Sequence, residues 1–276
     1  MVFEMKQDDV VMITGGASGI GAATAERALA MGKRVVIADI DIERAQQMAD
    51  QLGRGAWAVK LDITRDGEWN SALDTIWARE GRLDVLINNA AIVHTGWARD
   101  VPLSAHLRTL ETNCMGAING MMTTLPRLKQ QGSGHLITVA SMVAFIPYPG
   151  LASYAAAKHA LRAFHVALSI EEKDGPVAFT LVYPGATETP MLEKETQDDA
   201  LALAFAGAPM LPEDVAKSIV DAIASRPDEV YLPPERGEAV RKLGVDISAL
   251  REHVEKSAIV GWEKLQERRK RLAPAS

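Results

Sequence analysis

Two hydrophobic periods alternate along the first two thirds of the sequence. Short runs rich in β-branched residues, which suit buried strands, are followed by longer stretches with apolar residues every three or four positions, as on one face of a helix. This alternation is typical of stacked βαβ units, and it predicts a parallel sheet with helices on both faces. Each crossover between neighbouring parallel strands is expected to be right-handed.

The predicted elements fill one domain over residues 1–233. The strands are expected at residues 10–14, 34–38, 56–60, 83–88, 135–140, 178–183 and 230–232. The helices are expected at residues 20–31, 42–51, 68–79, 103–129, 154–173 and 213–225. No internal repeat, low-complexity tract or Gly/Ser linker interrupts this region, so we predict no further division of it.

Residues 234–276 differ in composition and form a predicted helical extension. The segment is charged, carries a basic run at 267–271, and has apolar residues three or four positions apart. These are Leu250, Val254, Ala258, Trp262 and Leu265. We expect an amphipathic helix that packs on the domain or on a partner subunit. Contact with an anionic membrane is the less favoured alternative, because one short basic run is usually a solvated face.

Composition excludes several classes of function. A chain of 276 residues with 47% hydrophobic and 24% charged residues is neither disordered nor fibrous. Its net charge of -6 would repel a phosphate backbone, so we expect no nucleic-acid partner. The only cysteine, Cys114, cannot form an internal disulfide and is expected to be a packed residue in a cytoplasmic protein. The sequence start lacks a secretory signal, and the six histidines show no metal-binding spacing.

The glycine-rich segment after the first predicted strand points to a bound phosphate. Residues 14–21 read TGGASGIG and open directly into the helical stretch AATAERALA. A strand, a glycine turn and a helix start together aim backbone N–H groups and the positive end of the helix dipole at one point, which is how a pyrophosphate is held. We expect the cofactor to contact this turn through Gly15, Ser18, Gly19, Ile20 and Gly21.

Asp39 ends the second predicted strand, at the place where such folds bind the ribose of the adenosine half. Its carboxylate would accept hydrogen bonds from both ribose hydroxyls and would repel the 2′-phosphate of NADP. No basic residue stands at Ser18 or Ile40 to offset that repulsion. The sequence therefore predicts NAD as the cofactor. The alternative role for Asp39 is to cap the N-terminus of the next helix.

Tyr154 and Lys158 lie four positions apart in SYAAAKHAL, so both side chains project from one face of a predicted helix. Oxidation of an alcohol requires the hydroxyl proton to leave as the hydride leaves carbon, and an ordinary tyrosine is a poor base at neutral pH. A nearby ammonium group and an oxidised nicotinamide would lower the pKa of Tyr154. We therefore expect Tyr154 to act as general acid and base and Lys158 to lower its pKa. Ser141, which follows a strand at the ligand-binding edge of the sheet, is expected to hold the substrate oxygen.

The Gly-x-x-x-Gly-x-Gly spacing after Thr14, together with these residues, resembles the short-chain dehydrogenase/reductase family over about residues 8–232. The resemblance implies a single-domain Rossmann-type, doubly wound parallel sheet with helices on both faces, followed here by a C-terminal helical extension. It places Asp62 and Ile63 beside the adenine, and residues 88–91, which include Asn89, Ala90 and Ala91, beside the cofactor. Ala91 stands where the family usually has glycine, so this position must either avoid positive φ or carry the strain of it. We expect a small local adjustment near the cofactor rather than lost binding.

The resemblance also completes the predicted active site. It adds Asn113, whose side chain is expected to hold a water beside Lys158 and to connect the site to solvent. It places Pro184 and Gly185 beside the nicotinamide, and it implies that the backbone of Thr187 and the hydroxyl of Thr189 bind the carboxamide. This geometry would fix which face of the nicotinamide ring is offered to the substrate.

Apolar residues dominate the loops where substrate contacts are expected, namely 93–97, 142–151 and 190–209. The predicted substrate contacts are Met142, Tyr148, Met191 and Leu192, within a set that also includes Phe145, Ile146, Leu151, Leu201, Leu203 and Phe205. A neutral, apolar secondary alcohol or ketone fits such a cleft best, cyclic or aromatic, and a steroid-like molecule is compatible with it. Residues 197–207 are expected to form a lid helix over the substrate.

Three functions are compatible with the sequence. The favoured one is an NAD-dependent alcohol dehydrogenase or ketone reductase. The first alternative is an NAD(H)-binding sensor or scaffold with an idle site, and the second is an epimerase or dehydratase that uses NAD transiently. By resemblance, the helices at 103–129 and 154–173 are expected to join subunits into a homodimer or homotetramer.

Overall fold

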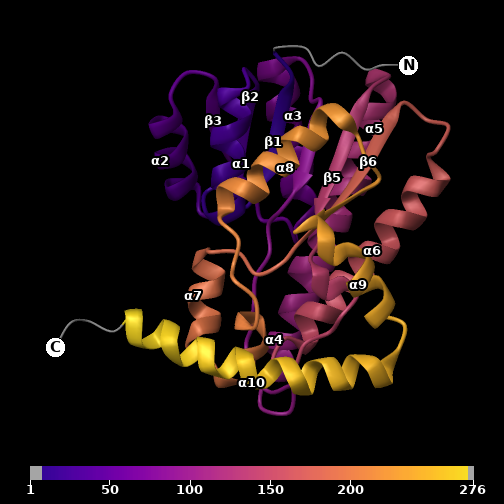
Figure 1. Cartoon of the computed structure of the whole chain (residues 1–276). Coiled ribbons are helices and arrows are strands. Elements are labelled where there is room, and N and C mark those ends of the chain that lie inside the picture. The colour runs from indigo at the N-terminus through magenta and orange to yellow at the C-terminus, as the bar shows by residue number, and fades with distance from the viewer. Residues whose placement is uncertain (1–7, 273–276) are drawn as a thin grey trace.

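A parallel sheet forms the centre of the computed structural model, which describes residues 8–272 (Figure 1). Its strands within these residues follow the order β3-β2-β1-β4-β5-β6-β7, and every neighbouring pair is parallel. They are β1 (Val10–Thr14), β2 (Arg34–Asp39), β3 (Ala56–Lys60), β4 (Val85–Asn88), β5 (Gly134–Val139), β6 (Val177–Pro184) and β7 (Glu229–Leu232). The predicted parallel sheet and all of its strands are confirmed. Residues 1–7, which include the sequence start considered above, and residues 273–276 lie outside the described residues.

Side chains of alternating residues along each strand pack on opposite faces of the sheet, as the twofold period of a strand requires. On β1, Val10 and Met12 belong to one hydrophobic cluster, and Val11 and Ile13 belong to another. The first cluster is covered by α3 (Asp66–Glu80), α5 (Ala117–Gln131) and α6 (Ala152–Glu171). The second is covered by α1 (Gly19–Ala30), α2 (Ile42–Leu52) and α8 (Pro212–Ser225). The sheet is therefore buried on both faces, which explains its apolar strands.

The prediction of one continuous α-helix at 103–129 is wrong in one respect, because the middle of this segment is π-helical. It consists of α4 (Leu103–Leu110), a π-helical turn over Glu111–Gly116, and α5. The buried Asn113 lies in this turn, where its side chain binds the backbone of Ile92. A π-helical turn inserts extra backbone into a helix and so redirects the side chains that it carries, a feature that sequence periodicity does not reveal.

The segment after β6 begins with α7 (Pro190–Thr196). The helix predicted at 197–207 is present as a 3₁₀ helix over Asp199–Phe205, and its role as a lid stays a prediction. After β7, a 3₁₀ turn over Pro234–Arg236 and α9 (Gly237–Leu243) lead into α10 (Ile247–Leu272). Figure 1 shows α10 lying across the bottom of the molecule, below α7.

The C-terminal helix α10 rests on the segment between β6 and α8. Leu265 is buried with Leu192, Ala202 and Phe205, and a Cβ at Gly261 would overlap the carbonyl oxygen of Ala202. The glycine therefore allows close approach of the two backbones. Trp262, predicted on the apolar face, is 44% exposed, because the buried face passes through Gly261 and Leu265 instead.

Candidate active site

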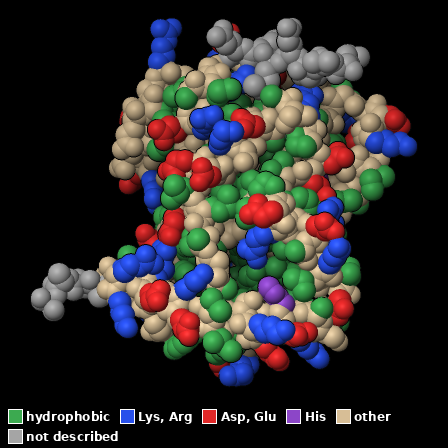
Figure 2. All heavy atoms as spheres, in the orientation of Figure 1, with side chains coloured by type: hydrophobic (Ala, Val, Ile, Leu, Met, Phe, Trp, Pro, Cys, Tyr) green, Lys and Arg blue, Asp and Glu red, His purple; other side chains and the backbone are tan. Residues whose placement is uncertain are grey.

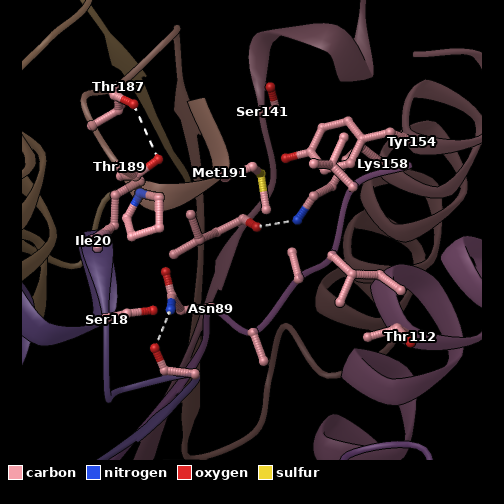
Figure 3. Close-up of a pocket in the computed structure, with 18 of the residues that line it drawn as sticks. Ser18, Ile20, Asn89, Thr112, Ser141, Tyr154, Lys158, Thr187, Thr189 and Met191 are labelled. Carbon is pink, nitrogen blue, oxygen red and sulfur yellow. Dashed lines mark hydrogen bonds between the residues drawn. The ribbon is translucent and has the colours of Figure 1, made fainter. Parts of the chain in front are cut away.

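A cavity of about 650 Å³ opens at the carboxyl ends of the strands. Its lining comes from the loops after β1, β2, β3, β4, β5 and β6, which all reach the same edge of the parallel sheet. Most of the predicted cofactor contacts meet there: Gly15, Ser18, Gly19, Ile20, Asp39, Asp62, Ile63, Asn89, Ala90, Ala91, Tyr154, Lys158, Pro184, Gly185, Thr187 and Thr189. Figure 3 shows Ser18 and Ile20 on one side of this cavity and Ser141, Tyr154 and Lys158 on the other.

The glycine turn has the shape that a pyrophosphate site requires. Gly15 has a φ of +62°, and a Cβ there would lie 2.8 Å from the Cα of Ala90. Gly21 lies beneath the turn rather than in the cavity lining, and a side chain there would overlap the carbonyl oxygen of Gly15. Helix α1 begins at Gly19, so its N-terminal backbone N–H groups lie beside the cavity. These residues fit the phosphates of a dinucleotide.

Asp39 holds the far end of the cavity in position. One of its carboxylate oxygens accepts from the N–H of Ala17 (3.2 Å) and the other from the N–H of Asp41 (3.1 Å). The cap of α2 is Asp41, which accepts from the N–H of Arg44, so the alternative role of Asp39 as the helix cap is wrong. Arg44 also lines the cavity, a cation that the sequence analysis did not consider.

Asn89 and Thr14 tie the loop after β4 to the loop after β1. The amide of Asn89 donates to the carbonyl oxygen of Thr14 (2.9 Å), and the Thr14 hydroxyl accepts from the N–H groups of Asn89 and Ala90. Ala91 avoids positive φ, since Arg226 is the only described non-glycine residue with positive φ. Although partial burial raises the pKa of Asp62, hydrogen bonds from Thr64 and Arg65 more than offset it, and the pKa is lowered overall.

Ser141, Tyr154 and Lys158 lie together on one wall of the cavity, as predicted (Figure 3). Tyr154 and Lys158 come from the first two turns of α6, and Ser141 follows β5. The ammonium of Lys158 lies 5.7 Å from the centre of the Tyr154 ring and donates a 2.8 Å hydrogen bond to the carbonyl oxygen of Val139. The Ser141 hydroxyl accepts from the N–H of Val143 at 3.3 Å.

In the protein without a cofactor, the environment of Tyr154 opposes ionisation of its hydroxyl. The pKa of Tyr154 is raised, because burial disfavours the phenolate and the carboxylate of Glu195 repels it. Burial also lowers the pKa of Lys158 to about 8, which weakens the cation that should assist the phenolate. The expected lowering of the Tyr154 pKa, which applies to the site with oxidised nicotinamide bound, therefore stays a prediction. The positive charge of an oxidised nicotinamide would act in the opposite direction.

The side chain of Asn113 binds the backbone of the loop after β4. Its carbonyl oxygen accepts from the N–H of Ile92 (2.8 Å), and its amide donates to the carbonyl oxygen of the same residue (2.7 Å). The expectation that the side chain holds a water beside Lys158 stays a prediction, since the amide oxygen and the amide NH2 can each form one more hydrogen bond. Asn113 fixes the loop at Ile92, which lines the cavity.

The loop after β6 brings Thr187 and Thr189 to the lining of the cavity. The Thr189 hydroxyl donates to the carbonyl oxygen of Thr187 (3.1 Å) and accepts from the N–H of Leu192 (3.4 Å), so it also caps α7. Pro190 follows at the first position of that helix, where a proline needs no N–H partner. The start of α7 is therefore set by the same residue that is expected to contact the carboxamide.

The substrate side of the cavity is partly as predicted. Tyr148, Met191 and Leu192 line it, together with Leu151, Val143, Val93 and Ile92. Met142 does not belong to the lining, which corrects that prediction. It is buried in a cluster with Phe145 and Tyr183, because the 3₁₀ turn over Met142–Ala144 points it into the core. The charged residues Arg108, Glu111, Lys194 and Glu195 also line the cavity and were missed.

The remaining sequence expectations concern residues away from this wall. Cys114 is buried, and burial raises the pKa of its thiol, so it behaves as a packed residue. Among residues 8–272, no three His, Cys, Asp or Glu side chains are grouped so that they could hold a metal ion. None of the helices described is long and apolar enough to cross a membrane.

Comparison with known proteins identifies the family to which this chain is similar. The model of the short chain dehydrogenase family matches residues 9–200. A 2,5-dichloro-2,5-cyclohexadiene-1,4-diol dehydrogenase of Sphingobium indicum is 33% identical over 185 residues, 66% of this chain and 74% of that protein. A 3-alpha-(or 20-beta)-hydroxysteroid dehydrogenase of Mycobacterium tuberculosis is 31% identical over 189 residues, 68% of this chain and 73% of that protein.

A solved structure also shares the fold. The short chain dehydrogenase/reductase of Burkholderia phymatum, determined in complex with NAD, superimposes with a TM-score of 0.81 at 24% identity, over 89% of this chain and 96% of that one. The fold, the grouped active-site residues and the family match together show that the chain belongs to the short-chain dehydrogenase/reductase family. It is therefore a nicotinamide-dinucleotide-dependent oxidoreductase.

Proposed function

We propose that the protein is an NAD-dependent dehydrogenase or ketone reductase for an apolar, cyclic or aromatic secondary alcohol. The observation that carries this proposal is the meeting of Ser141, Tyr154 and Lys158 on the wall of the cavity that the glycine turn also lines. Relatives named for a cyclohexadiene diol and for hydroxysteroids support a cyclic substrate, and a steroid-like one is compatible with it.

The chain's own residues would carry the proton chemistry. A bound nicotinamide dinucleotide would supply the hydride acceptor for oxidation, or the donor for reduction. Ser141 holds the substrate oxygen by a hydrogen bond, and the Tyr154 phenolate removes the hydroxyl proton during oxidation. In reduction Tyr154 returns this proton to the carbonyl oxygen. Lys158 favours the phenolate by its positive charge, and the apolar lining excludes water from the reacting atoms.

We propose NAD rather than NADP because Asp39 lines the adenosine end of the cavity. Arg44 lines the same end and would attract a 2′-phosphate if the carboxylate were removed. Asp39→Ala should therefore lower kcat/KM with NAD and raise it with NADP. The gain with NADP should disappear in the double variant that also carries Arg44→Ala.

The proposed function is tested by offering NAD and a panel of cyclic and aromatic secondary alcohols and measuring the formation of NADH by its absorbance. Tyr154→Phe should abolish turnover while NADH still binds, because only the proton-transferring hydroxyl is lost. Binding of NADH without turnover of any alcohol or ketone would contradict the proposal and favour the sensor function.

Two further proposals concern the setting of this reaction. We propose a homodimer or homotetramer joined through α4, α5 and α6, on which Leu103, Leu107, Met122 and Ile170 are exposed. A single cysteine and NAD-linked chemistry support the cytoplasm as the proposed location. Size-exclusion chromatography with light scattering would test the assembly, and a monomer would contradict it.

A further inference from the structure

The substrate half of the cavity contains an acidic side chain that the reaction described above does not use. Glu195 lies on α7, is 9% exposed, and lines the cavity. No described residue donates a hydrogen bond to its carboxylate or forms an ion pair with it. A buried carboxylate without a partner is costly, so such groups are usually satisfied by a ligand or serve the chemistry.

Glu195 differs from its neighbours on α7, which contact other parts of the chain. Leu192 packs against Leu265 of α10. The Thr196 hydroxyl accepts a hydrogen bond from Arg268 and donates one to the carbonyl oxygen of Leu192. Glu195 instead faces the same cavity as Tyr154, and its charge acts on the Tyr154 phenol. Glu195 therefore lines the cavity into which a substrate held at Ser141 and Tyr154 would extend.

We propose that Glu195 binds a second hydroxyl group of the substrate, so that the preferred substrate is a cyclic diol or hydroxyketone rather than a simple alcohol. This inference rests on the proposed function of the same site. An ionised carboxylate would accept a hydrogen bond from the second hydroxyl, while the first hydroxyl lies at Ser141 and Tyr154.

A hydroxyl fits the charges around the cavity better than an ammonium group does. The substrate side of the cavity is lined by Arg108, Lys158 and Lys194 together with Glu111 and Glu195, so the acids there are matched by cations. A substrate cation would gain attraction from the acids and lose it again to Arg108 and Lys194. A neutral donor satisfies the Glu195 carboxylate without that cost. Val93, Leu151, Met191 and Leu192 provide apolar contacts for the ring between the two hydroxyl groups.

The experiment compares cyclohexanol with 1,2-, 1,3- and 1,4-cyclohexanediol and with 4-aminocyclohexanol, using NAD and the intact chain. The wild-type protein should prefer one diol to cyclohexanol by about 10- to 100-fold in kcat/KM, the effect of one hydrogen bond to a charged group. Glu195→Leu should remove most of this preference, chiefly by raising KM for the diol. Glu195→Gln, which keeps the shape and can still accept a hydrogen bond, should retain part of it.

The matched control is Glu193→Gln, on the exposed side of the same helix, which should leave the preference unchanged. Thermal unfolding of each variant and NADH binding show whether the fold and cofactor site are intact. A diol preference that survives in Glu195→Leu, or a preference for the amino alcohol, would overturn the proposal.

The same design separates this proposal from the broader one. If no alcohol is oxidised, the proposed function fails, and the Glu195 inference is then judged by binding. The NADH complex should be stabilised against thermal unfolding by the diol more than by cyclohexanol, and this difference should be lost in Glu195→Leu. Equal stabilisation by both ligands in the wild-type protein would overturn the inference independently of turnover.

Discussion

The residues around Tyr154 set its acidity through opposing effects. Burial raises the pKa of Tyr154, and the Glu195 carboxylate raises it further. Burial raises the pKa of Glu195 itself to about 7, so its repulsion of the phenolate acts mainly above that pH. Lys158, with a pKa lowered to about 8, loses its helpful charge in nearly the same range. The tyrosine is therefore held neutral until a ligand or cofactor changes these charges.

Glu195→Gln should shift the pH dependence of alcohol oxidation to lower pH. Oxidation requires Tyr154 to accept a proton, so kcat/KM rises as pH passes upward through its pKa. Removing the Glu195 charge leaves burial as the cause that raises this pKa, and the pKa falls. Profiles of kcat/KM for cyclohexanol at saturating NAD would measure the shift. An unchanged or more alkaline profile would show that Glu195 does not act on Tyr154.

The same substitution should stabilise the protein. A carboxyl group with a pKa of 4.5 in the unfolded chain and about 7 in the folded chain binds its proton more tightly when folded. Folding is therefore penalised above pH 4.5, and the penalty reaches its full value above about pH 7. Removing the charge should stabilise the fold by about 2–3 kcal/mol at pH 8, with little effect at pH 4. Urea unfolding at both values tests this, and destabilisation at pH 8 would mean that the carboxylate has a partner.

Some of these residues could be found in the sequence and others could not. Tyr154 and Lys158 are recognisable because both lie on one helix, where a spacing of four fixes their relative position. Glu195 carries no such signal, since its place in the cavity depends on how α7 packs against α10. Asn113 was found by resemblance, but its hydrogen bonds to Ile92 were not predicted, because the π-helical turn that carries it has no periodic pattern.

At the scale of elements, α10 forms side-chain contacts that hold residues 188–199, which include α7, beside the cavity. We call these contacts the clamp. Arg268 donates two 2.6 Å hydrogen bonds to the carboxylate of Glu188 and one to the Thr196 hydroxyl. These hydrogen bonds lower the pKa of Glu188. Arg269 donates to the carbonyl oxygen of Thr196 and to Asp199. Figure 2 shows blue Lys and Arg side chains gathered at the C-terminal end of the molecule, where α10 lies in Figure 1.

Arg268→Ala should loosen α7 and the 3₁₀ helix that follows it. The loss of a bidentate, partly buried ion pair should cost about 1–3 kcal/mol of stability and raise KM for the alcohol more than it lowers kcat. Limited proteolysis within 190–207 should become faster, and this change measures the opening directly. Arg268→Lys should restore only part of the effect, because an ammonium cannot make the paired contact.

The control for this prediction lies on the same helix. Lys256 pairs with Glu252 on the exposed face of α10, and Lys256→Ala should change neither KM nor the rate of proteolysis. Equal cleavage of the wild-type and Arg268→Ala proteins would contradict the role of the clamp. The sequence predicted a C-terminal helix, but it did not predict this contact, because charged residues on an amphipathic helix are ordinarily solvated.

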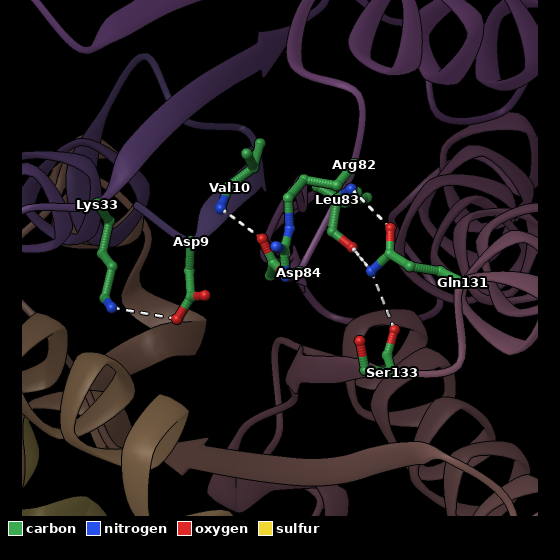
Figure 4. A network of polar contacts seen from close by, with 8 residues as sticks. All are labelled: Asp9, Val10, Lys33, Arg82, Leu83, Asp84, Gln131 and Ser133. Carbon is green, nitrogen blue, oxygen red and sulfur yellow. Dashed lines mark hydrogen bonds and ion pairs between the residues drawn. The ribbon is translucent and has the colours of Figure 1, made fainter. Parts of the chain in front are cut away.

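At the scale of the whole molecule, the two ends of the sheet have separate tasks. The carboxyl ends of the strands form the cavity, and the opposite ends are joined by a polar network (Figure 4). The carboxylate of Asp84 accepts from the N–H of Val10 (2.8 Å) and from Arg82, and Lys33 pairs with Asp9. The Gln131 side chain exchanges two hydrogen bonds with the backbone of Leu83. The backbone of Leu83 is therefore bonded to a side chain, and β4 begins at Val85 rather than at the predicted residue 83.

Asp84→Ala should therefore destabilise the fold without changing the chemistry of the site. Its loss leaves the buried N–H of Val10 and the guanidinium of Arg82 without their shared acceptor, at a cost of about 2–4 kcal/mol. For a chain of this size the melting temperature should fall by roughly 5–15 °C. NADH affinity and kcat/KM at a temperature where both proteins are folded should remain within twofold of wild type, because the cavity lies at the other end of the strands. Loss of NADH affinity parallel to stability would show that the two ends of the sheet are coupled.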